Sequence, residues 1–122
     1  MVVMNRGRIL VAEDESLIAM QLEDVLREIG FDVVGPVSTV KDVVSHVETE
    51  ELGGALLDVN LRGEAVLGVL QSLKDRDLPF IITSGYDAAS LFPPQFRDVP
   101  RVVKPFDEDE LKRLCLKMFV KA

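Results

Sequence analysis

The stretch Ala55-Leu56-Leu57-Asp58-Val59 decides the fold, because it is an apolar run of strand length with one carboxylate near its end. A run without polar alternation is typical of a strand buried on both faces of a parallel sheet. Similar short runs lie before it at 8–12 and 31–34, and after it at 80–84 and 101–103. Amphipathic helical patterns fill the intervening segments. The alternation predicts an α/β fold with one doubly wound parallel sheet of five strands and helices on both faces.

Two helices are expected on the N-terminal side of that stretch. Ser16 is a predicted N-cap for the first helix, which ends near Gly30, a residue suited to a left-handed helix end. Gly35-Pro36 is expected to stop the second strand, Ser38 to cap the second helix and Gly53-Gly54 to break it. The predicted buried faces consist of Leu17, Ile18, Leu22, Val25, Leu26 and Ile29 in the first helix and Val40, Val43, Val44 and Val47 in the second.

The C-terminal half of the pattern contains one irregular stretch. A third helix is expected over 64–75, and Asp107 with Glu110 forms a capping-box-like start for the last helix. Between the fourth and fifth strands, the segment 88–92 is followed by Pro93-Pro94, and proline disfavours helix interiors. A fourth helix is therefore expected to be short or irregular. The last helix is expected to bury Leu111, Leu114, Cys115 and Met118.

Length and composition favour one domain and argue against several functions. The 122 residues, 48% of them hydrophobic, suffice for a single core, so a single domain over 1–122 is expected. The 21 acidic and 14 basic side chains give a formal net charge of -7, which argues against a nucleic-acid surface. The sequence shows no secretory leader and no apolar run of membrane-spanning length. A cytoplasmic protein with neither nucleic acid nor membrane as a partner is the plain interpretation.

Polar side chains follow four of the predicted strands at the points where these strands end. Glu13 and Asp14 follow the first strand, Asp58 lies at the end of the third, Ser84 ends the fourth and Lys104 follows the fifth. Since ligands bind beyond the carboxyl ends of parallel strands, these side chains are expected to meet at one edge. Close carboxylates repel one another unless a cation lies among them, and an oxygen ligand set suits Mg²⁺ better than Zn²⁺.

Each of these residues alone has a simpler structural explanation. Asp14 could cap the first helix, Ser84 could be a turn hydroxyl and Lys104 could be a surface lysine. Four such strand ends in one chain, in this order, favour a common site. Elsewhere, His46 is expected at the surface or boundary of the second helix, and the single cysteine, Cys115, is expected in the core.

Four motifs span most of the chain: Ile9-Leu10-Val11-Ala12-Glu13-Asp14-Glu15, Ala55-Leu56-Leu57-Asp58-Val59-Asn60-Leu61, Pro79-Phe80-Ile81-Ile82-Thr83-Ser84-Gly85 and Val102-Val103-Lys104-Pro105-Phe106. Together they resemble the CheY-like response-regulator receiver domain. The resemblance implies the flavodoxin-like strand order 2-1-3-4-5 and a role in two-component signal transduction. It also implies Mg²⁺ as the cofactor and a sensor histidine kinase as the partner that donates a phosphoryl group from a phosphohistidine.

The resemblance assigns the acidic residues residue by residue. Asp58 matches the phosphoacceptor, Asp14 the acid that contacts Mg²⁺ directly, and Glu13 its neighbour, which acts through water. Asn60 matches the position whose backbone carbonyl completes the metal site. The expected chemistry is physically reasonable, because Mg²⁺ offsets the repulsion between a carboxylate and an incoming phosphoryl group.

The resemblance also assigns four residues around the expected phosphoryl position. Ser84 matches the switch hydroxyl, and Gly85 a position that is kept small so that the phosphoryl group can approach. Lys104 matches the lysine that pairs with the phosphoryl oxygens, and Pro105 the proline after it, often cis. An acyl phosphate would draw Ser84 toward it by a hydrogen bond and move the loop after the fourth strand.

The chain departs from the receiver pattern at two positions. Arg101 stands three residues before the lysine, where an aromatic switch residue is common, and Arg62 stands where the family often has proline. The residues around Arg62 and the run Ser84-Gly85-Tyr86 resemble the stand-alone FAT GUY receivers, which are associated with kinases of the HWE or HisKA2 type. In that subclass, Tyr86 or the loop 87–100 would take the place of the aromatic residue.

Several functions stay open at this level. The first is a stand-alone receiver without an output domain, which signals by phosphorylation-dependent protein contacts. It is expected to be a phosphoacceptor that catalyses the phosphotransfer to itself and its own dephosphorylation, and not an enzyme. The alternatives are a phosphate sink for its kinase, a receiver cut from a longer regulator, and a degenerate receiver that only binds partners; homodimerisation is open in each case. A phosphatase of the haloacid dehalogenase type would need a second Asp as general acid where the chain has Asn60.

Overall fold

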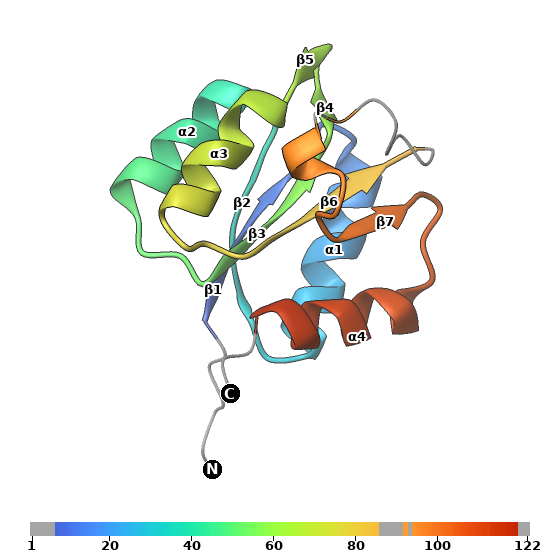
Figure 1. Ribbon diagram of the computed structural model, residues 1–122. Coiled ribbons are helices and arrows are strands. Elements are labelled where there is room, and N and C mark those ends of the chain that lie inside the picture. Colours follow the sequence, from blue (N-terminus) through green and yellow to red (C-terminus); the bar gives the residue numbers. More distant parts are fainter. Residues whose placement is uncertain (1–6, 86–91, 93, 120–122) are drawn as a thin grey trace.

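A five-stranded parallel sheet forms the centre of the protein, with the strand order β2-β1-β3-β6-β7 (Figure 1). This order and the α/β class confirm the prediction, since the five long strands in chain order are arranged 2-1-3-4-5. The computed structural model describes residues 7–85, 92 and 94–119. The strands are β1 (Arg8–Ala12), β2 (Asp32–Val37), β3 (Gly54–Asp58), β6 (Phe80–Ser84) and β7 (Arg101–Val103).

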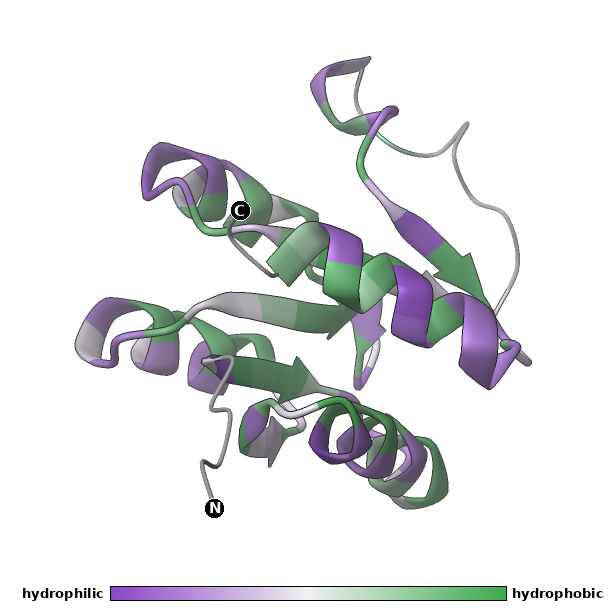
Figure 2. Cartoon of the chain, turned by 90° about the horizontal axis from the view of Figure 1, so that it is seen from below, coloured by the Kyte–Doolittle hydropathy of each residue, from purple (hydrophilic) through white to green (hydrophobic). Residues whose placement is uncertain are grey.

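Helices cover both faces of this sheet, and each face has its own apolar core. On one face, α2 (Val40–Thr49) and α3 (Leu67–Asp75) pack with the 3-10 helix η2 (Pro94–Phe96) against alternate residues of the strands. On the other face, α1 (Ser16–Glu28) packs with α4 (Glu108–Phe119). Figure 2 shows largely hydrophobic strands between helices of mixed hydropathy, as a three-layer fold requires. No helix in the described part of the chain has the length and apolar character to cross a membrane.

The second strand runs past the point where it was expected to stop. β2 continues through Gly35-Pro36 to Val37, and its register with β1 shifts between Leu10 and Ala12. Gly35 has a φ of +95°, and the extra residue at this bulge lets pairing with β1 resume at Val37. The prediction that Gly35-Pro36 ends the strand is therefore wrong, because the glycine is used to bend the strand rather than to leave it.

Gly35→Ala is expected to lower the free energy of unfolding by about 2 kcal/mol, because the backbone is left-handed and crowded there. An added Cβ would lie 2.8 Å from the Val37 nitrogen and 2.9 Å from the Val11 carbonyl oxygen. The matched control is Gly68→Ala in α3, where an added Cβ meets no atom within 4 Å and the stability should stay equal or rise by up to about 1 kcal/mol. Urea unfolding of both variants tests this, and an unchanged midpoint for Gly35→Ala would contradict it.

The helix ends are only partly as expected. Gly30 has a φ of +96° just after α1, as predicted, and Asp107 accepts hydrogen bonds from the amides of Asp109 (2.8 Å) and Glu110 (3.4 Å). The capping of the first two helices differs from the prediction. Glu15 is the N-cap of α1 and makes no side-chain cap, and Thr39, not Ser38, caps α2.

Thr39→Ala is expected to lower the free energy of unfolding by about 1 kcal/mol, because one helix amide loses its partner. The Thr39 hydroxyl accepts a hydrogen bond from the Asp42 amide at 3.1 Å. Ser38→Ala is the control, since the structure places Ser38 one residue outside the cap. Chemical denaturation should rank Thr39→Ala clearly below Ser38→Ala, and equal losses would show that the cap contributes nothing specific.

The expected third helix begins three residues late, because a small hairpin precedes it. Strands β4 (Asn60–Leu61) and β5 (Glu64–Ala65) pair antiparallel around Arg62 (φ +51°) and Gly63 (φ +82°). Two successive residues with positive φ are typical of a tight hairpin turn. The helical pattern over 64–75 is therefore correct only from Leu67 onward.

Two apolar residues that were expected inside lie at the surface instead. Leu17 is 81% exposed in the first turn of α1, and Val44 is 36% exposed on α2. The spacing of each residue fits the apolar stripe of its helix, but neither side chain is covered by the core. Cys115 is buried as predicted, and burial raises the pKa of its thiol to about 12.

The irregular stretch between β6 and β7 is confirmed where the structure describes it. Residues 88–91 and Pro93 lie outside the described residues. In the described part, η2 is a single 3-10 turn, and both Phe92 and Phe96 are buried. The prolines thus coincide with a short, non-α element, as expected.

Candidate functional site

The carboxyl ends of β1, β3, β6 and β7 bring the predicted polar side chains to one edge of the sheet. Asp58 is the last residue of β3, and its register partner on β6 is Thr83, next to Ser84. Glu13 directly follows β1, and Lys104 directly follows β7. In Figure 1 the hairpin of β4 and β5 rises above this edge. The topology therefore brings these residues, which are far apart in sequence, to one edge of the sheet, as predicted.

Lys104 connects two of the acids at the centre of the site. Its Nζ donates to Glu13 Oε2 at 2.7 Å and to Asp58 Oδ2 at 2.9 Å. Glu13 is 3% exposed and Asp58 is 8% exposed, so these charges are largely removed from water. Burial raises the pKa of Glu13 to about 7, with the neighbouring Asp58 adding to the rise and Lys104 opposing it. Burial alone would lower the pKa of Lys104, but its bonds to Glu13 and Asp58 outweigh burial and raise it.

Glu13, Asp14 and Asp58 together offer an oxygen ligand set for a cation. One carboxylate oxygen from each residue lies within 4.8 Å of the other two. The backbone holds these carboxylates in place: the Asn60 amide donates to Asp58 Oδ1 at 3.1 Å, and the Arg62 amide donates to Asp14 Oδ2 at 3.0 Å. The three carboxylates carry more negative charge than the single lysine neutralises. A hard divalent cation therefore suits this cluster.

A cavity of about 470 Å³ opens beside these residues. Its walls include Asp14, Asp58, Asn60, Gly85 and Lys104, all of which the sequence singled out. Among the residues that the structure describes, none has an atom within 4 Å of a Cβ added at Gly85. The cavity thus offers a reacting group access to Asp58 from the side on which the small residue was expected.

Phe92 also lines this cavity, although no sequence motif gives it a role. Its only sequence signal was its position next to Pro93-Pro94 within the loop that was expected to replace the aromatic switch. The other unassigned lining residues are Glu15, Val59, Ala65 and Leu67.

The remaining predicted residues surround the site. Ser84 is 1% exposed, and its carbonyl accepts a hydrogen bond from the Lys104 amide at 2.7 Å, which ties the ends of β6 and β7 together. The bond between Lys104 and Pro105 is cis, as the resemblance implies. Arg101 lies on β7 with its guanidinium over the Phe92 ring, 5.6 Å from the centroid. Tyr86 lies outside the described residues.

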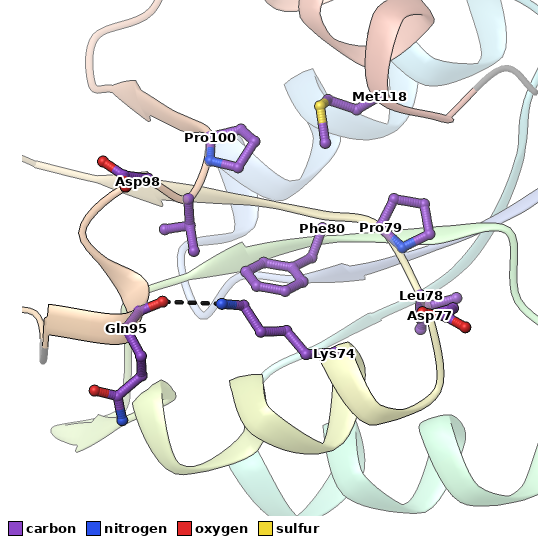
Figure 3. A pocket seen from close by; sticks show the side chains of 10 residues that line it. Lys74, Asp77, Leu78, Pro79, Phe80, Gln95, Asp98, Pro100 and Met118 are labelled. Carbon is purple, nitrogen blue, oxygen red and sulfur yellow. Dashed lines mark hydrogen bonds between the residues drawn. The ribbon is translucent and has the colours of Figure 1, made fainter.

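A second cavity, of about 520 Å³, lies at the opposite end of β6 and contains none of the predicted site residues (Figure 3). Pro79, Phe80 and Pro100 contribute apolar walls, and Met118 reaches it from α4. Lys74 Nζ donates to the Gln95 carbonyl at 2.9 Å there. Six of its ten lining residues are apolar, and none of the three acids of the cluster lies there.

The fold and this site define a receiver domain, and comparison with known proteins agrees. The family model of the response regulator receiver domain matches residues 9–115. The chain belongs to this family, whose members act in two-component signalling.

Three relatives illustrate the similarity. The solution structure of SdrG from Sphingomonas melonis Fr1 is 39% identical, with a TM-score of 0.77 over 93% of this chain and 94% of that one. The transcriptional regulatory protein PdtaR of Mycobacterium tuberculosis (strain CDC 1551 / Oshkosh) is 29% identical over 108 residues, which cover 85% of this chain and 52% of PdtaR. The chain thus spans about half the length of the curated relative.

The third relative shares the fold at lower identity. It is the receiver domain of the sensor histidine kinase PA1611 from Pseudomonas aeruginosa PAO1, solved with a magnesium ion coordinated in its active-site cleft. It is 21% identical, with a TM-score of 0.79 over 93% of this chain and 97% of that one. At this identity the likeness shows the fold.

Proposed function

We propose that Asp58 accepts a phosphoryl group from a sensor histidine kinase in a Mg²⁺-dependent reaction, and that the modified chain signals by protein contacts. The observation that carries this proposal is the position of Lys104, whose Nζ bridges Glu13 and Asp58 at the wall of an open cavity. An ammonium beside a buried carboxylate is suited to receive the oxygens of an incoming phosphoryl group. No other described cluster combines a lysine, three acids and access from a cavity.

Magnesium fits the acidic cluster by the chemistry of its donors. Asp14, Asp58 and the backbone carbonyl of Asn60 would bind the ion directly, and Glu13 through a water molecule. When bound, Mg²⁺ would neutralise negative charge on the phosphoryl oxygens. The PA1611 receiver supports this assignment, since its active-site cleft holds magnesium.

Three residues of the chain would have separate roles in the transfer of the phosphoryl group. A carboxylate oxygen of Asp58 forms the new bond to phosphorus, the bond from phosphorus to the histidine nitrogen of the kinase breaks, and that nitrogen keeps the electron pair. Lys104 would move from carboxylate to phosphoryl oxygens, and the Ser84 hydroxyl would donate to a phosphoryl oxygen. The transfer requires no further reactant.

The chain is proposed as an acceptor rather than as a hydrolase with an acid at position 60. The Asn60 side chain accepts a hydrogen bond from the Gly63 amide at 2.8 Å, and an amide can't act as a general acid. The kinase is proposed to be of the HWE or HisKA2 type, which the run Ser84-Gly85-Tyr86 supports. A phosphate sink is the second candidate, because the same site would serve it.

Incubation with acetyl phosphate and Mg²⁺, followed by intact-mass spectrometry, tests the proposal. The expected result is one phosphoryl group per chain, which disappears when a chelator replaces Mg²⁺. Absence of an adduct under conditions in which a known receiver is modified would overturn the proposal. Capture of partners with and without beryllium fluoride then separates signalling from a phosphate sink, because a sink has no partner that depends on the modified state.

A further inference from the structure

Phe92 brings a buried aromatic ring to the wall of the Asp58 cavity. It is 2% exposed and shares that wall with Gly85 and Lys104. The ring comes from the loop before η2, whereas β7 supplies Arg101 at the position where the family commonly has an aromatic residue. The aromatic group at this site is therefore supplied by a different segment of the chain.

Two arginines contact Phe92. The Arg101 guanidinium lies over the ring at 5.6 Å from its centroid, and Arg101 Nη1 donates to the Arg97 carbonyl at 2.7 Å. Arg97 Nε in turn donates to the Phe92 carbonyl at 3.4 Å. The Arg101 head group therefore contacts the Phe92 ring directly and is connected to the Phe92 backbone through Arg97.

Arg101 also lines a second surface hollow, a groove between β7 and α4. With Glu110, Arg113, Leu114 and Lys117 of α4, it lines this groove of about 380 Å³. The Asp58 cavity does not include any of these α4 residues. Phe92 and Arg101 together thus form a chain of contacts from the Asp58 cavity to the groove between β7 and α4.

We propose that Phe92 and Arg101 form the switch pair of this protein. This inference rests on the proposed phosphoacceptor role of Asp58. A phosphoryl group on Asp58 adds negative charge to this cavity, whose wall includes Phe92, and the Arg101 guanidinium lies over the Phe92 ring. The new charge alters the balance of the cation–π contact, and Arg101 carries the change to the groove at α4. Phe92 acts as a positioning residue, because it makes no bond to the reacting atoms.

The same loop supplies a matched control for Phe92. Phe96 is 4% exposed, and its ring also makes a cation–π contact, since Lys74 Nζ lies 4.9 Å from the ring centroid. Phe96 does not line the Asp58 cavity, and Lys74 belongs to the cavity at the opposite end of β6 (Figure 3). A general effect of losing a buried aromatic ring should therefore appear in both variants, and a switch effect only at Phe92.

The test is an NMR titration of the whole chain with beryllium fluoride and Mg²⁺. In the wild type, the Asn60 amide and the signals of Arg113, Leu114 and Lys117 should shift together. In Phe92→Leu and Arg101→Gln, the Asn60 shift should persist, while the shifts at the groove fall by at least about threefold, because the cation–π contact is lost. In Phe96→Leu, both sets of shifts should match the wild type.

Three outcomes would overturn the inference. The first is an undiminished response of the groove in Phe92→Leu, and the second is a wild-type groove that does not respond although Asn60 does. The third is an equal loss in Phe96→Leu, which would mean general loosening of the loop. A wild type in which Asn60 does not respond, and in which acetyl phosphate leaves no adduct, contradicts the phosphoacceptor role itself and the inference with it.

Discussion

Asp58→Asn should leave no detectable phosphoryl adduct after incubation with acetyl phosphate and Mg²⁺. The amide replaces a carboxylate that is both the proposed nucleophile and one of three acids in the cluster. It keeps a similar shape but has one acceptor oxygen, so it can accept the hydrogen bond from the Asn60 amide or the one from Lys104 Nζ, but not both. The variant should still fold, because the substitution removes a charge and leaves the size of the side chain unchanged. Intact-mass spectrometry measures the adduct, and circular dichroism verifies the fold.

Asp24→Asn is the matched control for this experiment. Asp24 is an exposed carboxylate on α1 and is absent from the acidic cluster. This variant should be modified to the same extent as the wild type. An adduct of unchanged yield in Asp58→Asn would mean that another side chain accepts the phosphoryl group.

Lys104→Met should slow phosphorylation by about 10²–10³-fold, because the group that receives charge on the phosphoryl oxygens is removed. It should also lower the free energy of unfolding by about 2 kcal/mol in the absence of Mg²⁺. The reason is that Glu13 and Asp58 lose the cation that they share, although partial contact of the site with water reduces the penalty. Phosphorylation rates and urea unfolding with a chelator present measure the two effects.

Magnesium and a second lysine provide the controls for Lys104. Mg²⁺ should stabilise Lys104→Met more than it stabilises the wild type, since the ion meets less positive charge in the variant. Lys112→Met removes the bridge between Lys112 and Glu28 (3.0 Å), where the Glu28 side chain is 65% exposed, and should change the free energy of unfolding much less than Lys104→Met does. Equal losses in both variants would contradict the special role of Lys104.

Much of the fold could be predicted because it depends on regular patterns. The apolar runs mark all five strands of the main sheet, and the polar residues that follow them meet at one edge, as the connectivity requires. The sequence alone predicts the residues that form the acidic cluster, Glu13, Asp14 and Asp58. Topology alone was sufficient there, since strand ends in a parallel sheet leave few alternatives.

The errors occurred where a local signal competes with a contact distant in sequence. The hairpin around Arg62 interrupts a helical pattern, and the Arg62 amide is bound by Asp14, 48 residues away in sequence. Gly35 reads as a strand end, but pairing with β1 continues beyond it. Phe92 belongs to no recognisable motif. Its proposed role depends on a contact with Arg101 that the spacing of the two residues in the sequence does not predict.

The two outer strands of the sheet bear on how the protein behaves at high concentration. β2 forms one edge and contains Pro36, which has no amide hydrogen to offer, and the bulge at Gly35 twists the strand away from a flat ribbon. β7 forms the other edge and is only three residues long. Both edge strands are poor templates for a further strand, so the sheet resists edge-to-edge growth into aggregates.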